Sequence, residues 1–224
     1  MATILQQVYA EAAAGSASQT LTLSQTITAG STVVVMTGFG RTGGTPDISS
    51  VVNNGTANTY TQVTGARGAN TTNNPRMMTD VWYVDGANGS GTTVTVTFNT
   101  TSATVTFVGV IEFSNTLSPS VNYGAGASGA TTPAVAGTIS VPGGQLLLSC
   151  IITAAGTVNS VASPWTAVVG SVSFMSAYYD LPPAGTYGPT YTLSGNNRWA
   201  SSTVGADLTA VTNNASNVLL KKVT

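Results

Sequence analysis

Polar and apolar residues alternate along much of the chain. Residues 93–98 have the order Thr-Val-Thr-Val-Thr-Phe, and residues 104–113 repeat this pattern. Such alternation predicts strands with one buried and one exposed face, because successive side chains of a strand point to opposite sides. Further segments rich in Val, Thr and aromatic residues are also predicted strands, at 20–27, 32–39, 59–63, 77–84, 138–141, 145–152, 165–169, 172–179, 190–193 and 201–208.

Turns of Gly, Pro, Asn and Asp separate nearly all of these segments. Many short strands without intervening helices favour antiparallel sheets packed face to face over parallel sheets with crossover helices. We therefore expect an all-β protein whose residues 19–211 form an antiparallel β-sandwich or jelly roll. Residues 1–18 are predicted to be an N-terminal arm, and residues 212–224 a C-terminal tail or closing strand.

Short motifs recur in the same order in two parts of the chain. The matched segments are 26–30 with 139–143, 60–63 with 165–168, 82–83 with 178–179, and 110–113 with 205–208. This pattern predicts two pseudo-repeated halves, residues 19–117 and 137–211, joined by the linker 118–136. We expect one domain, in which the two halves form two layers around one core.

The N-terminal residues permit two structures. Ile4, Leu5, Val8 and Tyr9 have helical spacing, but they also suit an arm in β conformation. Such an arm either closes the edge of the protein's own sheet or pairs with a neighbouring subunit.

The composition excludes most catalytic chemistry. The 224 residues include 6 Lys or Arg, 7 Asp or Glu and no His, whereas roughly a quarter of a typical soluble protein is charged. His-based triads and His-liganded metal sites are therefore excluded, and the one cysteine, Cys150, cannot form an intrachain disulfide or a Cys-based zinc site. We expect no enzyme activity, no cofactor and no bound metal.

The charge also limits the partners. The net charge is -1, and Arg41, Arg67, Arg76 and Arg198 are scattered, which argues against a nucleic-acid partner. A net charge near zero gives little repulsion between copies and suits an assembly. The first residues lack a basic segment followed by a long apolar one, and no apolar run approaches the about 20 residues of a membrane span. We expect synthesis in a cytoplasm and no membrane partner.

One glycine motif has a structural explanation. Residues 38–43 fit the nucleotide-binding pattern G-x-G-x-x-G, but no helix is predicted after them. We therefore interpret the motif as a Gly-rich connection between strands.

The acidic residues also have structural explanations. Glu112 and Asp207 occupy matched positions and could act as an acid and base pair, but alternation predicts that Glu112 faces solvent or another subunit. Asp80, Asp85 and Asp180 offer oxygen ligands for calcium. Because their spacing matches no EF-type loop, we favour turn-forming roles for them.

Two aromatic pairs are candidates for ligand stacking. Trp82 with Tyr83, and Tyr178 with Tyr179, lie on predicted strands, so each pair is expected to place one ring inward and one outward. Cys150, within an apolar strand, is expected to be a small buried residue.

The first half contains a characteristic series of motifs, which are Gly-Ser-Thr-Val-Val-Val at 30–35, Ile-Ser-Ser-Val at 48–51, Asn-Thr-Tyr-Thr-Gln-Val at 58–63, Trp-Tyr at 82–83 and Val-Ile-Glu-Phe-Ser at 110–114. Together with the strand at 93–98, this order resembles β-sandwich domains of tailed-phage virion proteins and bacterial surface proteins. The resemblance covers most of the chain and implies a jelly-roll-like structural or binding module without catalytic residues. Among phage proteins, a small chain of this kind is similar to capsid decoration (cement) proteins, which bind the outer head lattice, often as trimers.

From this resemblance we expect a virion structural protein that decorates and stabilises a capsid. Its expected partners are the major capsid protein and its own copies, in a trimer. The alternative is a carbohydrate-binding adhesion module of a tail fibre or cell-surface protein, with Trp82 and Tyr179 stacking on the glycan. Arg67 and Arg76 flank a polar loop at 68–75. The expected contacts with the capsid or another subunit are Ile4, Leu5, Val8, Tyr9, Arg67 and Arg76.

Overall fold

The computed structural model describes residues 3–13, 16–72, 74–99, 103–114, 117–118 and 124–208. Every regular secondary-structure element within these ranges is a β-strand, so the all-β prediction is confirmed. The described residues accordingly include no helix that could cross a membrane. The predicted C-terminal tail, 212–224, and residues 119–123 of the predicted linker lie outside the described residues.

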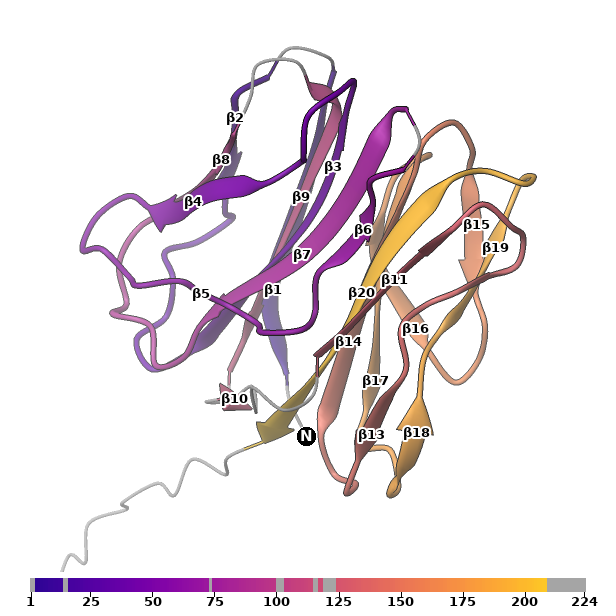
Figure 1. The fold of residues 1–224 in the computed structure, drawn as a ribbon. Coiled ribbons are helices and arrows are strands. Elements are labelled where there is room, and N and C mark those ends of the chain that lie inside the picture. Colours follow the sequence, from indigo (N-terminus) through magenta and orange to yellow (C-terminus); the bar gives the residue numbers. More distant parts are fainter. Residues whose placement is uncertain are drawn as a thin grey trace, which may run out of the picture.

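The first half forms a large and a small antiparallel sheet (Figure 1). The large sheet has the order β1 (Ile4–Ala13), β9 (Ala103–Phe113), β3 (Thr32–Arg41), β7 (Arg76–Val84) and β5 (Thr61–Gln62), and β6 (Gly68–Asn70) also pairs with β7. The small sheet has the order β2 (Ser18–Thr22), β8 (Thr93–Phe98) and β4 (Ile48–Asn53).

The second half is built in a similar way. Its large sheet has the order β10 (Leu117–Ser118), β20 (Trp199–Leu208), β14 (Leu146–Thr153), β17 (Phe174–Asp180) and β16 (Thr166–Gly170), and β11 (Gly124–Gly129) also pairs with β20. The outer strands form a three-stranded sheet, β12 (Ala134–Val135), β19 (Thr190–Leu193) and β15 (Val158–Val161), and a two-stranded sheet, β13 (Ile139–Val141) and β18 (Gly185–Tyr187).

The two halves share a strand order. The series β1-β9-β3-β7-β5 of the first half corresponds to β11-β20-β14-β17-β16 of the second, and β2-β8-β4 corresponds to β12-β19-β15. In both halves the chain passes repeatedly between the large sheet and the outer sheet, as it does in Greek-key sandwiches. A duplicated unit would give this order. The jelly-roll assignment, the pseudo-repeat and the individual motif matches stay predictions.

The two large sheets pack face to face, which gives four layers instead of the expected two (Figure 1). A central hydrophobic cluster combines residues of both halves, among them Met36 and Ile111 with Leu148 and Ile152. Separate clusters fill the space between the large and outer sheets of each half. The expectation of a single core between two layers is therefore wrong.

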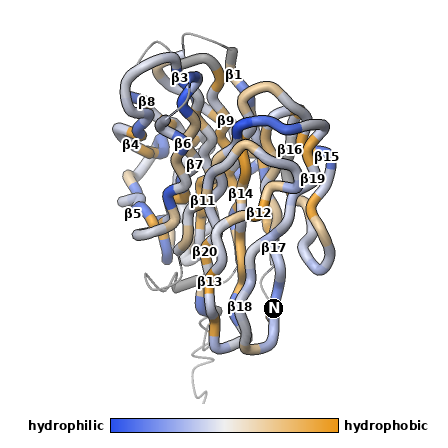
Figure 2. The backbone as a smooth tube through the Cα atoms, turned by 45° about the vertical axis from the view of Figure 1, so that its right-hand side comes forward, coloured by the Kyte–Doolittle hydropathy of each residue, from blue (hydrophilic) through white to orange (hydrophobic). Residues whose placement is uncertain are grey.

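This arrangement explains why two central strands lack alternation. Every residue of β14, and every residue of β3 except Arg41, is buried. Both strands lie in inner layers, so each strand is covered on its two faces. The side chains on both faces must therefore be apolar or small. Figure 2 shows β14 largely in the colours of hydrophobic residues.

The N-terminal residues form an edge strand and not a helix. β1 runs antiparallel to β9, from Ile4 opposite Phe113 to Ala13 opposite Val105. The segment therefore pairs within the protein's own sheet, and pairing with a neighbouring subunit stays a prediction.

Candidate binding site at the junction of the two halves

Two glycine-containing strands meet where the halves join. β6 belongs to the large sheet of the first half, and β11 to that of the second. A methyl group at Gly68 would collide with the carbonyl oxygen of Ser201, and one at Gly126 would collide with that of Arg67. Ser201 lies on β20, so glycine is needed at both positions because the backbone of the first half directly contacts that of the second.

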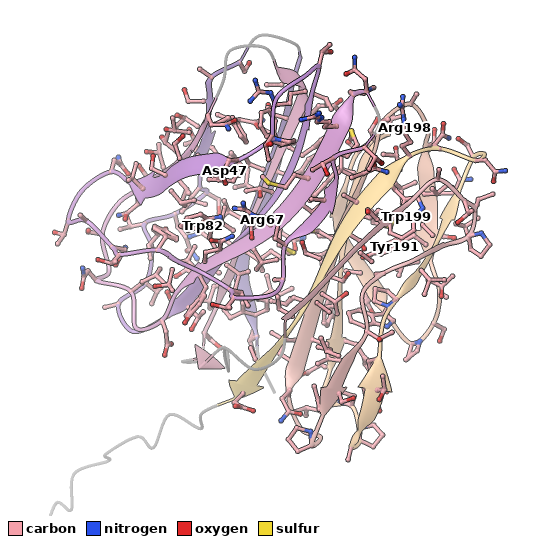
Figure 3. The ribbon with its side chains drawn as sticks, in the orientation of Figure 1. Asp47, Arg67, Trp82, Tyr191, Arg198 and Trp199 are labelled. Carbon is pink, nitrogen blue, oxygen red and sulfur yellow. The ribbon has the colours of Figure 1, made fainter. Side chains whose placement is uncertain are left out.

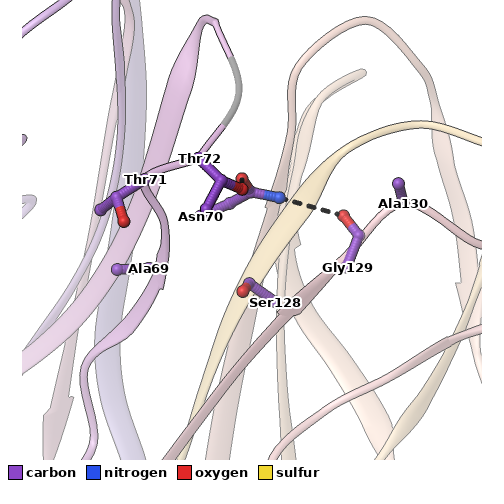
Figure 4. A pocket seen from close by; sticks show the side chains of 7 residues that line it. All are labelled: Ala69, Asn70, Thr71, Thr72, Ser128, Gly129 and Ala130. Carbon is purple, nitrogen blue, oxygen red and sulfur yellow. Dashed lines mark hydrogen bonds between the residues drawn. The ribbon is translucent and has the colours of Figure 1, made fainter.

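A hollow of about 310 Å³ lies at this junction (Figure 4). Both halves contribute to its walls, and the lining side chains are small and uncharged. They are Ala69, Asn70, Thr71 and Thr72 from the first half, and Ser128, Gly129 and Ala130 from the second. Ligand sites occur preferentially at such interfaces between structural units.

Asn70 connects the two walls. Its side chain reaches toward the second half (Figure 4), where Nδ2 donates a hydrogen bond of 3.4 Å to the carbonyl oxygen of Gly129. The hydroxyl of Thr72 donates to Asn70 Oδ1 at 3.5 Å. Thr71 and Ser128 are exposed, so their hydroxyls are accessible to a ligand.

Trp199, labelled in Figure 3, supports the second wall. Its ring lies against Gly129, and its Nε1 donates a hydrogen bond of 3.1 Å to the carbonyl oxygen of Thr131. The backbone N–H of Thr132 donates to Asn196 Oδ1 at 3.1 Å. These contacts fix the segment that follows β11.

Arg67, a predicted contact residue, is part of an ion-pair network (Figure 3). Its Nη2 lies 2.8 Å from both Asp80 Oδ2 and Asp47 Oδ1. Gln62 Nε2 also donates to Asp80 Oδ2, at 2.6 Å. Asp80 is fully buried within β7 and is not a turn residue. Burial raises the pKa of its carboxyl group, and the hydrogen bonds and charge of Arg67 oppose this effect.

Glu112 is buried, which corrects the prediction that it faces solvent or another subunit. Its side chain has no exposed surface; Oε2 accepts a hydrogen bond of 2.5 Å from Gln6 Nε2, and Oε1 accepts one of 2.7 Å from the backbone N–H of Thr28. The prediction failed because β9 is an inner strand with both faces covered. Asp207, in the second half, accepts a hydrogen bond of 3.0 Å from Gln145 Nε2 of the same half.

The structure therefore gives these two carboxylates separate partners, each within its own half, instead of a shared cleft. Among the described residues, no group of three or more Cys, Asp or Glu side chains is placed to hold a metal ion.

Trp82 and Tyr179, the candidate stacking rings, are half-buried and belong to different halves. Trp82 packs against the outer cluster of the first half (Figure 3), and Tyr179 contacts Tyr187 edge-on with ring centroids 5.6 Å apart. Their neighbours Tyr83 and Tyr178 pack against the central cluster and are half-buried too. No ring of either pair is therefore fully exposed, and the two candidate rings do not form one platform.

The other predicted contact residues differ in accessibility. Ile4 and Val8 are half-buried because they pack against the protein's own clusters, and Leu5 is also half-buried. Tyr9 is exposed over 47% of its surface. Arg76 donates a hydrogen bond of 2.6 Å from Nη1 to the carbonyl oxygen of Gly44.

The polar loop at 68–75 and the predicted linker at 118–136 are far apart in the sequence, and no sequence signal indicates that they meet. Both walls of the hollow come from these segments. No protein-family model, no curated protein and no solved structure matches the chain.

Proposed function

We propose that this protein is a non-catalytic structural component of a phage virion, which decorates the outer capsid surface and stabilises it. The observation that carries the proposal is the continuous core through which the two halves pack into one four-layer body. Such a body suits a load-bearing subunit. The resemblance of the sequence motifs to phage virion domains supplies the location.

The use of the charged groups supports the same proposal. Asp80 and Glu112 are fully buried and bonded to other residues of the fold. Both ion pairs among the described residues involve Arg67. These groups therefore have structural roles, and few charged groups remain on the surface. A surface poor in charge favours close packing beside other copies of the protein and beside capsid subunits.

The accessible edge of β1 is the proposed contact with the major capsid protein or with another copy in a trimer. β1 pairs with β9 on one side and has no other sheet partner among the described strands. Exposed edges of this kind present backbone N–H and C=O groups to a further strand. Tyr9 adds a ring at the middle of the edge.

The first test is the number of copies in each particle, measured by quantitative mass spectrometry of purified virions. Decoration predicts hundreds of copies. A number in the tens or below would place the protein on the tail and contradict the proposal, and so would its absence from the particle.

The edge contact is tested by adding purified protein to heads that lack it. We expect Tyr9→Ser to reduce occupancy, whereas Val52→Ser, which changes an equally exposed residue on the small sheet, should leave it unchanged. Equal occupancy for both variants would overturn the role of the β1 edge.

A further inference from the structure

We propose that the hollow at the junction of β6 and β11 binds a neutral saccharide of one or two sugar rings. Its volume of about 310 Å³ lies at the lower end of the range for small-molecule sites. The inference does not depend on where the protein is located in a virion.

The lining matches the chemistry of a sugar. The exposed hydroxyls of Thr71 and Ser128 can each donate and accept hydrogen bonds, as sugar hydroxyls do. The methyl groups of Ala69 and Ala130 offer apolar contact for the C–H groups of a ring. No charged side chain lines the hollow, and a charged ligand would lack the ion partner that compensates its desolvation.

The walls are fixed before a ligand arrives. The hydrogen bond from Asn70 to Gly129 joins them, and the backbone contacts at Gly68 and Gly126 set their separation. Trp199 supports the second wall through its contact with Gly129 and its hydrogen bond to Thr131. A site with ordered walls loses less entropy on binding than a flexible one.

This site differs from a stacking site built on Trp82 and Tyr179. Those rings do not line the hollow, so binding rests on hydrogen bonds that compete with water. We expect a Kd of about 1 mM for a single site. Many copies on one particle would raise the effective affinity for a surface that carries the sugar repeatedly.

The test begins with an array of neutral hexose, N-acetylhexosamine and acidic glycans, probed with the intact protein. A neutral glycan that binds is then titrated into isotope-labelled protein and followed by NMR. We expect chemical-shift changes concentrated at residues 69–72 and 128–130.

Two serine variants provide the matched comparison. Ser128→Tyr fills the hollow and should weaken binding by at least about tenfold, whereas Ser140→Tyr on β13, exposed and outside the hollow, should leave binding unchanged. Thermal unfolding checks that both variants are folded, and Thr71→Val, which removes one hydroxyl with little change in shape, gives a second comparison if Ser128→Tyr does not fold.

Three results would overturn the proposal. They are the absence of binding by neutral glycans at about 10 mM, binding of acidic glycans alone, and shift changes outside the two walls. None of these results bears on the copy number in the virion, so the failure of this site and the failure of capsid decoration are distinguishable.

Discussion

Phe107 on β9 and Phe174 on β17 stack across the boundary between the two halves, with ring centroids 5.2 Å apart and ring planes inclined by 9°. Both rings are fully buried. Elsewhere on the same boundary, Ser202 Oγ donates a hydrogen bond of 2.8 Å to Thr79 Oγ1. The boundary is thus packed and bonded like a domain interior, and the two halves are expected to unfold together.

Phe174→Ala tests this coupling. Removal of a buried phenylalanine ring leaves a cavity and typically costs about 3–5 kcal/mol. We expect a loss of that size in urea unfolding, with one transition that includes both halves. Val172→Ala, at a residue that is 62% exposed, should change stability by less than about 0.5 kcal/mol. Two separate transitions in the unmutated protein would contradict the coupling.

Gln6→Ala tests how β1 is held. Gln6 is buried, and its amide donates to Glu112 Oε2 and accepts a hydrogen bond from the backbone N–H of Gln25. Its loss leaves a buried carboxylate without one partner, so we expect a cost of about 2–4 kcal/mol. The neighbouring Gln7 is exposed, and Gln7→Ala should cost less than about 0.5 kcal/mol. Similar values for the two variants in urea unfolding would show that the buried bond contributes little.

The sequence predicted the fold class well because the alternation of residues follows directly from strand geometry. Thr93–Phe98 alternates in sequence, and its side chains alternate between buried and half-buried in β8. A single sequence indicates which face of a strand is apolar, but it does not identify the sheet that covers each face. For this reason the sequence did not predict that Glu112 is buried or that the protein has four layers.

The hollow could not be predicted for a related physical reason. Asn70 and Ser128 are small polar residues in segments rich in Gly, Ala, Ser, Thr and Asn, which is the ordinary composition of exposed loops. Only the packing of the two large sheets brings these segments together. In the sequence, this packing is marked by the need for glycine at positions such as Gly68 and Gly126. Because glycine is common throughout this chain, these two positions do not stand out.

Cys150 provides a chemical readout of the junction. It is fully buried in the central cluster, and burial raises the pKa of its thiol, which disfavours the reactive thiolate. We expect negligible reaction with a chromogenic disulfide reagent at about pH 8 in the folded protein and full reaction in urea. Phe174→Ala should accelerate the reaction, because it loosens the same cluster. Rapid reaction of the unmutated folded protein would show that the junction opens readily.

Asp80 makes the stability depend on pH. Because burial raises its pKa in the folded protein, the folded state keeps this proton at pH values where the unfolded chain, with a carboxyl pKa of about 3.9, has lost it. The contribution of this group to stability is therefore fully present below about pH 4 and is lost as the pH rises through the folded-state pKa.

Asp80→Asn isolates that contribution, because the amide side chain does not titrate. We expect the free energy of unfolding to fall with pH more steeply in the unmutated protein than in Asp80→Asn, when both are unfolded with urea at several values between about pH 4 and pH 7. Asp47→Asn is the matched control, since Asp47 contacts the same guanidinium but its side chain is 49% exposed; it should change stability by less than about 1 kcal/mol. Identical slopes for the unmutated protein and Asp80→Asn would mean that the Arg67 ion pair fully offsets the burial of the carboxylate.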